Sequence, residues 1–342
     1  MPIKQFQDTS SVSIAYAMDD AADSSELSSP EMKYLPYTTE GFTMAKETQA
    51  STAISSDRRP NGSKNTKGTA TGSVGLEFGF ANFIADMLSA SLMNTWTVDT
   101  AAADGSEFIY DGEQLRYFFV EKRIKGNKAG VRHNFIERYY GNLANETTIE
   151  IGTSELISMA VNTMCAYADM ADADASSDED AGGEGTSYAR PADYEIADGA
   201  NNVKNIVFRD SGGTPLELTM SQASLSISNN VREQPAIGKE FTAGMTVGKV
   251  GAGLSGTAYY YDDTLLKTHM NNGTLSAEFE ITTPDGSFMF YLPKLRAETP
   301  TANSQGENQD YSQSLTLTAE RGSMSLGGND VECVIAVVRK IA

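Results

Sequence analysis

The residue types that could carry chemistry are sparse in this sequence. Its two histidines, His133 in GVRHNF and His269 in KTHMNN, belong to no motif that joins either of them to a nucleophile or to a set of metal ligands. The sequence also lacks a CxxC pair, a Walker loop and a nucleophile elbow. We therefore interpret both histidines as surface or loop residues, and we predict a protein that is not an enzyme and uses no cofactor or metal.

Two segments imitate binding motifs without completing them. GAGLSG at 251–256 matches the glycine fingerprint of dinucleotide-binding proteins, but it runs into TAYYY, which is typical of a strand and not of the required helix. DADASSDED, from Asp172, alternates carboxylates as a calcium loop does. It has Ser177 where such a loop needs glycine and Gly183 where it needs a bidentate glutamate. We expect a flexible start of a strand in the first case and weak cation attraction in the second.

The hydrophobic pattern predicts a mainly β protein with one prominent amphipathic helix. Val74, Leu76 and Phe78 alternate with small or polar residues, which is the period of a strand with one buried face. Similar alternation predicts half-buried antiparallel strands around residues 225–227, 279–281 and 315–317. In FANFIADMLSASLMN the apolar residues recur at helical spacing, which predicts a helix packed on its own sheet. Near the C-terminus, VECVIAVV predicts a strand covered on both faces.

The order strand, basic-ended loop, strand, helix recurs along the chain. ISSDRR at 54–59 has a counterpart in ISNNVR at 227–232, and each is followed by a strand pattern and a short apolar helical stretch. Such repetition suggests duplication of one domain. An acidic segment between the copies cannot bury enough apolar surface to order itself. We expect an N-terminal arm at 1–30 and two β-sandwich or barrel-like modules, at 31–168 and 205–342, that each have a flanking α-helix. The segment between them, at 169–204, is expected to be an acidic linker or exposed loop.

The charge balance bears on the possible partners. The 342 residues carry a formal net charge of −20, which argues against clasping nucleic acid, because that binding draws on Lys and Arg. A surface that repels DNA suits a conduit, while solubility alone would also account for the charge. The opening MPIKQFQDTS lacks the apolar core of a signal peptide, and no run is long enough to span a membrane. We expect synthesis in the cytoplasm, no membrane contact, and buried free thiols at Cys165 and Cys333.

Two cationic stretches stand out against this acidic background. SSDRRPNGSKNTKG is expected to form a loop that gathers Arg58, Arg59, Lys64 and Lys67. EKRIKGNKAGVR contains Lys122, Arg123, Lys125, Lys128 and Arg132. Either stretch is a candidate for contacting an acidic surface of a second copy, since charge complementarity sets register as well as affinity. The alternative is a solvated loop, because exposed ion pairs often contribute less than about 1 kcal/mol.

Several segments, taken in order, resemble a known family. They are YLPYTTEGFTMAKETQASTAISSDRR, GTATGSVGLEFGFANFIADMLSASLMNTW, SLSISNNVREQPAIG, LSGTAYYYDD and FMFYLP. In their order and spacing they resemble the major tail tube proteins of long-tailed bacteriophages with non-contractile tails. The resemblance implies a β-sandwich or barrel-like domain that assembles into rings. These rings would stack into a tube with an acidic lining, through which the genome leaves the virion.

The resemblance also implies partners. They are copies of the chain itself and the tail terminator, distal tail and tape measure proteins, while viral DNA passes without specific binding. Single-domain relatives are thought to form six-membered rings. A chain with two copies is therefore expected to close as a trimer with pseudo-sixfold symmetry in preference to a hexamer. The alternatives are another virion protein, such as a capsid decoration protein, and a surface adhesin, which should have an export signal and stay monomeric.

Overall fold

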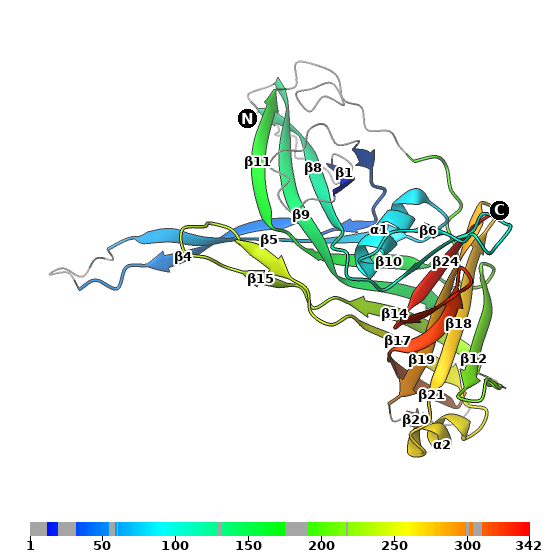
Figure 1. Ribbon diagram of the computed structural model, residues 1–342. Helices are drawn as coiled ribbons and strands as arrows, with labels where there is room; N and C mark the ends of the chain where they lie inside the picture. The colour runs from blue at the N-terminus through cyan, green and yellow to red at the C-terminus, as the bar shows by residue number, and fades with distance from the viewer. Residues whose placement is uncertain are drawn as a thin grey trace.

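A computed structural model gives the fold of the chain. It describes residues 12–19, 32–54, 59, 61–128, 131–174, 191–216, 218–298, 301–303 and 310–342. Antiparallel strands dominate this part of the chain, as the mainly β prediction requires, and two helices accompany them (Figure 1).

Six antiparallel strands form a continuous central sheet. In spatial order they are β5 (Ser63–Glu77), β10 (Ser158–Met164), β9 (Val131–Gly152), β14 (Met220–Ser228), β17 (Gly251–Tyr259) and β21 (Ser312–Ala319). The pairing of β9 with β14 joins the N-terminal and C-terminal halves of the chain edge to edge. Alternate residues of each strand face the core, which is the arrangement that the period-two pattern predicts.

The long strand β9 belongs to two sheets. Its first part pairs with β8 (Tyr117–Lys128) and β11 (Tyr167–Asp174), and β8 continues to β1 (Val12–Asp19) and β2 (Lys33–Tyr34). β9 bends from the sheet that it forms with β8 and β11 into the central sheet at Gly141 and Asn142. Gly141 has a φ of 57°, which favours glycine, and Asn142 is buried. The Asn142 side-chain amide donates hydrogen bonds to the carbonyls of Phe118 and Tyr139, at 2.8 and 2.7 Å, and so holds the bend.

A second layer covers one face of the central sheet. β19 (Gly286–Ala297) pairs with β21, β18 (Leu275–Thr283) and β24 (Ala336–Ile341). Its Phe288 and Phe290 meet Phe78 of the first half, with ring centroids 5.7 and 6.2 Å apart. The remaining strands of this layer are β12 (Val203–Asp210), β13 (Pro215–Leu216), β7 (Glu107–Tyr110) and β6 (Thr97–Val98), whereas β20 (Thr301–Asn303) pairs with β21 at the edge of the central sheet. One hydrophobic core therefore spans both halves of the chain.

Both helices occur where the sequence pattern predicts them. α1 (Asn82–Leu92) buries the predicted apolar stripe against the sheet and ends at Met93, whose φ is 50°. α2 (Thr264–Met270) buries only Leu265. The order strand, strand, helix occurs as β4 (Thr43–Ala50), β5, α1, whereas in the second half the β15–β16 hairpin (Arg232–Gln234, Gly244–Thr246) lies between β14 and β17, and α2 follows β17.

Two local predictions differ from the structure. The acidic segment at 169–204 begins inside β11, because Tyr167–Asp174 pair with β9, and it ends at the start of β12. Between them, Ile196 bridges to Gly79 and Ala197 is fully buried, so backbone pairing orders residues whose composition favours a loop. VECVIAVV forms two strands, β23 (Asn329–Cys333) and β24, because the chain turns between them. The short hairpins β15–β16 (Arg232–Gln234, Gly244–Thr246) and β22–β23, with β22 at Gly322–Leu326, complete the described fold with β3 (Thr39–Glu40).

Candidate assembly surfaces

The central sheet has one face that is not covered by the second layer, here called the polar face. Its residues lie opposite one another in rows that cross all or most of the six strands. One row is Glu77, Ser158, Glu150, Ser224, Ser255 and Thr316. The next is Gly75, Ala160, Thr148, Ser226, Gly253 and Thr318, and a third is Ser73, Asn162, Glu146, Ser228 and Gly251. The surface is consequently built of small and polar side chains.

The charges on the polar face all have one sign. Its rows contain the carboxylates Glu77, Glu146 and Glu150 and no Lys or Arg. The residues that alternate with them along the same strands face the core and are large and apolar. Examples are Leu76, Ile149 and Leu225, which are nearly or fully buried. Serine and glycine at every second position of SLSIS and GAGLSG are the sequence signal for this face. The alternation predicted the strands, but it did not show that their polar sides share one surface.

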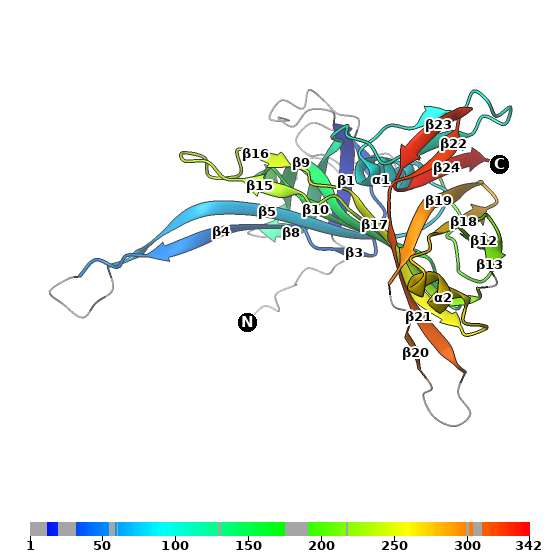
Figure 2. The ribbon, with the colours of Figure 1, turned by 60° about the horizontal axis from the view of Figure 1, so that its bottom comes forward.

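The first cationic stretch lies on a hairpin arm and not in a single loop. Residues 43–54, 59 and 61–67 are here called the arm, which projects from the body of the molecule (Figures 1 and 2). Lys64 and Lys67 belong to strand β5, because the ladder with β4 continues to Ser63, whereas Arg59 is exposed beyond it. Arg58 lies outside the described residues. The expected loop is therefore shorter than the spacing of its Gly and Asn residues suggests.

The β15–β16 hairpin anchors the base of the arm. Lys67 forms an ion pair with Glu233 at 2.8 Å, and this hydrogen bond raises the pKa of Lys67. Lys46 pairs with Glu240, whose carbonyl also accepts a hydrogen bond from the Gly68 N–H at 2.8 Å. Lys67 is thus used within the chain, whereas Lys64 makes no ion pair with any described residue.

The second cationic stretch forms the end of the β8–β9 hairpin. Lys122 pairs with Glu40 at 2.9 Å and lies 3.6 Å from Glu137. Arg123 is buried, and its Nε lies 2.6 Å from a carboxylate oxygen of Glu121. Lys125 is exposed on β8. Lys128 and Arg132 lie in β8 and β9, and their side chains are outside the described set. Because Lys122 and Arg123 have partners inside their own chain, this stretch is a weaker candidate for intermolecular contact than the arm.

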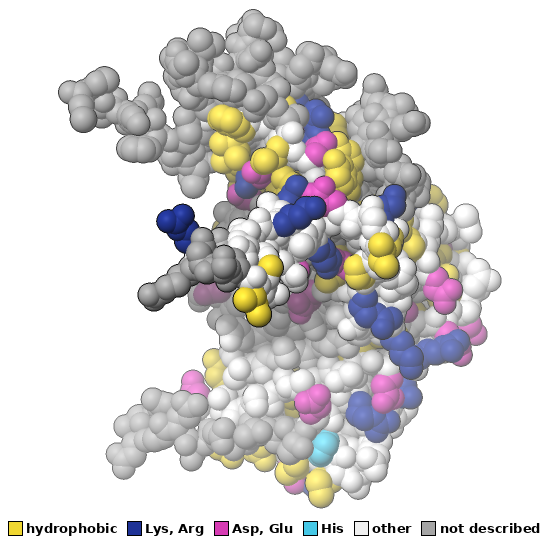
Figure 3. Space-filling view, turned by 90° about the vertical axis from the view of Figure 1, so that its left-hand side faces the viewer, with side chains coloured by type: hydrophobic (Ala, Val, Ile, Leu, Met, Phe, Trp, Pro, Cys, Tyr) yellow, Lys and Arg dark blue, Asp and Glu magenta, His cyan; other side chains and the backbone are white. Residues whose placement is uncertain are grey.

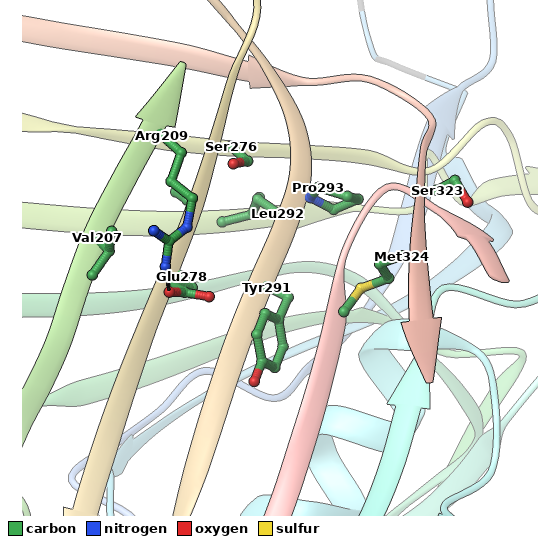
Figure 4. Close-up of a pocket in the computed structure, with 10 residues that line it drawn as sticks. Val207, Arg209, Ser276, Glu278, Tyr291, Leu292, Pro293, Ser323 and Met324 are labelled. Carbon is green, nitrogen blue, oxygen red and sulfur yellow. Dashed lines mark hydrogen bonds and ion pairs between the residues drawn. The ribbon is translucent and has the colours of Figure 1, made fainter. Parts of the chain in front are cut away.

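Among the described residues, one surface hollow contains an ion pair and another is lined in part by His269. The one in Figure 4 has a volume of about 210 Å³ and lies between β12, β18, β19 and β22. Its two charged side chains, Arg209 and Glu278, pair with each other at 2.5 Å. His269 lies in α2, not in a loop, and its Nδ1 is 2.8 Å from the carbonyl oxygen of Ala297. His133 lies in β9, and its side chain is not among those described.

Two further properties of the described residues concern metal binding and membranes. No three His, Cys, Asp or Glu side chains within them come together as metal ligands. None of their helices has the length and apolar character needed to cross a bilayer. Cys165 and Cys333 are buried free thiols, as the sequence predicts.

A family model described as phage tail tube protein matches residues 9–319, which is most of the chain and includes both halves of the central sheet. No curated protein matches the sequence.

Proposed function

This chain belongs to the phage tail tube protein family and is a structural component of the virion, and from that premise we propose that copies of it form stacked rings around a channel for the genome. The tube would conduct viral DNA into the host without binding it specifically. Its further partners would be the tail terminator, distal tail and tape measure proteins.

The polar face is the observation that carries this proposal. DNA binding draws on Lys and Arg to neutralise phosphates, and the rows of this face contain neither. Its carboxylates, Glu77, Glu146 and Glu150, repel phosphate, and its small side chains leave space in front of the sheet, where they line a shallow hollow. We propose that this face lines the channel, where repulsion keeps the DNA free to move.

Unpaired sheet edges support closure into a ring. Among the described strands, β4 pairs only with β5 and β20 pairs only with β21, so each leaves a free edge at its end of the sheet. Free edges are a liability in a monomer, and pairing with identical neighbours removes them. A sheet that continues from subunit to subunit would surround the channel.

The repeat within the chain supports a trimer with pseudo-sixfold symmetry. The first half contributes β5, β10 and β9 to the central sheet, and the second contributes β14, β17 and β21. We propose that residues 31–168 and 205–342 are two tube modules, that three chains close a ring, and that each ring presents six similar units.

Electron microscopy with cysteine labelling tests the proposal. The purified protein should form hollow filaments in negative stain. Asn162→Cys places a thiol on the polar face, while Ser211→Cys places one in an exposed loop of the second layer. In filaments, the cysteine at 162 should react with a small maleimide but not with a maleimide on a large polyethylene glycol, whereas the monomer should react with both.

The Ser211→Cys variant is the matched control, since its thiol should react with both reagents in filaments. Rapid labelling of position 162 by the large reagent in filaments would overturn the placement of the polar face. A particle that never forms hollow filaments would favour a capsid decoration protein or an adhesin instead.

A further inference from the structure

We propose that Asn61, in the arm, is a site of spontaneous deamidation, where the chain converts its own asparagine to aspartate and isoaspartate without an enzyme. Asn61 precedes Gly62 directly before β5, and both residues are exposed. The reaction needs only these two residues and water. The inference goes beyond the proposed tube and does not rest on it.

An asparagine followed by glycine is the residue pair best suited to this chemistry. The deprotonated backbone nitrogen of Gly62 attacks Cγ of Asn61, and the new C–N bond closes a succinimide ring. The bond between Cγ and the side-chain nitrogen breaks, and that nitrogen takes up a proton and leaves as ammonia. Water then adds to either ring carbonyl and opens the ring, which gives aspartate or isoaspartate. Gly62 favours the attack because it has no Cβ to hinder the approach.

The structure leaves the attacking nitrogen accessible. The Gly62 N–H makes no hydrogen bond with any described residue. Apart from its chain neighbours, no atom lies within 4 Å of the position that a Cβ on Gly62 would occupy. The Asn61 amide donates a hydrogen bond to the carbonyl of Ala53, across the arm. Because this bond is exposed, water replaces it readily and frees the side chain to turn toward Gly62.

A second Asn–Gly pair in the same chain has the opposite environment. Asn272 and Gly273 follow helix α2, and Asn272 is exposed like Asn61. The Gly273 N–H donates to the carbonyl of Thr268 at 2.8 Å, and the Asn272 N–H donates to that of His269 at 3.0 Å. A hydrogen-bonded amide gives up its proton only when the local structure opens. Exposure therefore does not distinguish the two asparagines, whereas backbone hydrogen bonding predicts that Asn61 reacts first.

Deamidation at this position changes the charge and the bonding of the arm. In the sequence, the new carboxylate stands between Arg59 and Lys64, both of which are exposed. Figure 3 views the molecule from the side on which the arm projects, and Lys and Arg side chains lie across this side. A carboxylate has no N–H, so the hydrogen bond to the Ala53 carbonyl is lost. The modified arm is thus less basic and has one hydrogen bond fewer.

Mass spectrometry of the full-length protein during storage tests the proposal. The purified protein is incubated in water enriched in a heavy isotope of oxygen and is then digested under mildly acidic conditions, which suppress further deamidation. Peptides that contain position 61 should gain heavy oxygen at least ten times faster than peptides that contain position 272. An isoaspartyl methyltransferase should methylate the peptide from position 61. Raising the pH from about 6 to about 8 should speed the loss of Asn61 at least tenfold, since only the deprotonated nitrogen attacks.

Unfolding and two variants provide the controls. In guanidinium the two Asn–Gly pairs should react at similar rates, because the hydrogen bond of the Gly273 N–H is lost. Asn61→Gln should abolish the reaction at position 61, since the longer side chain does not close the same ring, and should leave Asn272 unaffected. Asn61→Asp has the charge of the product and should elute in anion exchange with the acidic fraction of the stored wild-type protein.

The outcomes decide this inference separately from the proposed function. Survival of Asn61 in the native protein over a period in which it reacts in guanidinium would overturn the inference. Loss of Asn272 as fast as Asn61 in the native protein would overturn it as well. Aspartate formed without isoaspartate would exclude the succinimide and contradict the proposed chemistry. None of these measurements depends on filaments, whose absence would instead refute the tube.

Discussion

Asn229 is expected to hold the two halves of the chain together, and its replacement by alanine tests that role. The residue follows β14 and is only 3% exposed. Its side-chain amide donates to the carbonyl of Ser91 in α1 and to the carbonyl of Ala144 in β9, both at 2.9 Å. A single side chain therefore joins the loop after β14 to a helix and a strand of the first half.

The expected loss of stability follows from these two bonds. Asn229→Ala leaves two buried carbonyls without this donor, and each such group costs about 1 to 3 kcal/mol. We expect the free energy of unfolding to fall by about 2 to 5 kcal/mol in urea denaturation of the monomer, followed by circular dichroism, with an unchanged m-value. Asn230→Ala is the neighbouring control. Asn230 is exposed, has a φ of 49° and donates a hydrogen bond to the carbonyl of Lys249 at 2.8 Å, so alanine there should cost about 1 to 2 kcal/mol. A loss at Asn229 no larger than at Asn230 would refute the reasoning.

Three further predictions concern titratable groups. The hydrogen-bonded ion pairs of Glu320 with Arg296 and Lys294 lower its pKa from 4.5 to about 2. Its stabilising contribution is therefore present above pH 4.5 and is lost as the pH falls toward 2. Glu320→Gln should reduce the change of melting temperature with pH between pH 4.5 and 2. Burial raises the pKa of Asp169 above 3.8, so folding disfavours its charged form; Asp169→Asn should raise the melting temperature at pH 7, and this gain should vanish below pH 3.8. Burial raises the pKa values of Cys165 and Cys333 to about 12; both should resist a thiol reagent at pH 8 until guanidinium unfolds the protein, and rapid labelling of the native chain would contradict their burial.

Local pattern was enough to predict the elements that depend on nearby residues. The alternation at Val74, Leu76 and Phe78 predicted β5, and the spacing of apolar residues predicted α1, because burial of one face imposes a period on the sequence. The apolar neighbours of Cys165 and Cys333 predicted buried free thiols for a similar reason. The mainly β class and the family follow from the same segments.

The candidate surfaces were only partly predictable. The sequence marked Lys64 and Lys67 as members of a basic stretch, but only the β4–β5 ladder shows that they lie on an arm and that Lys67 is held by Glu233. By charge alone, Lys122 and Arg123 were equal candidates for contact between subunits. Their ion pairs within the chain make them weaker candidates. A charge pattern does not reveal which cations already have partners, because those partners come from distant parts of the chain.

The sequence by itself determined which residues form strands and helices and that the protein is acidic, since these properties are local or additive. Tertiary structure decided the pairing of β9 with β14, the single surface shared by Glu77, Glu146 and Glu150, and the projection of the arm from the body of the molecule. The physical reason is that register between distant strands is chosen by packing of the whole core, and many registers satisfy the same period of two.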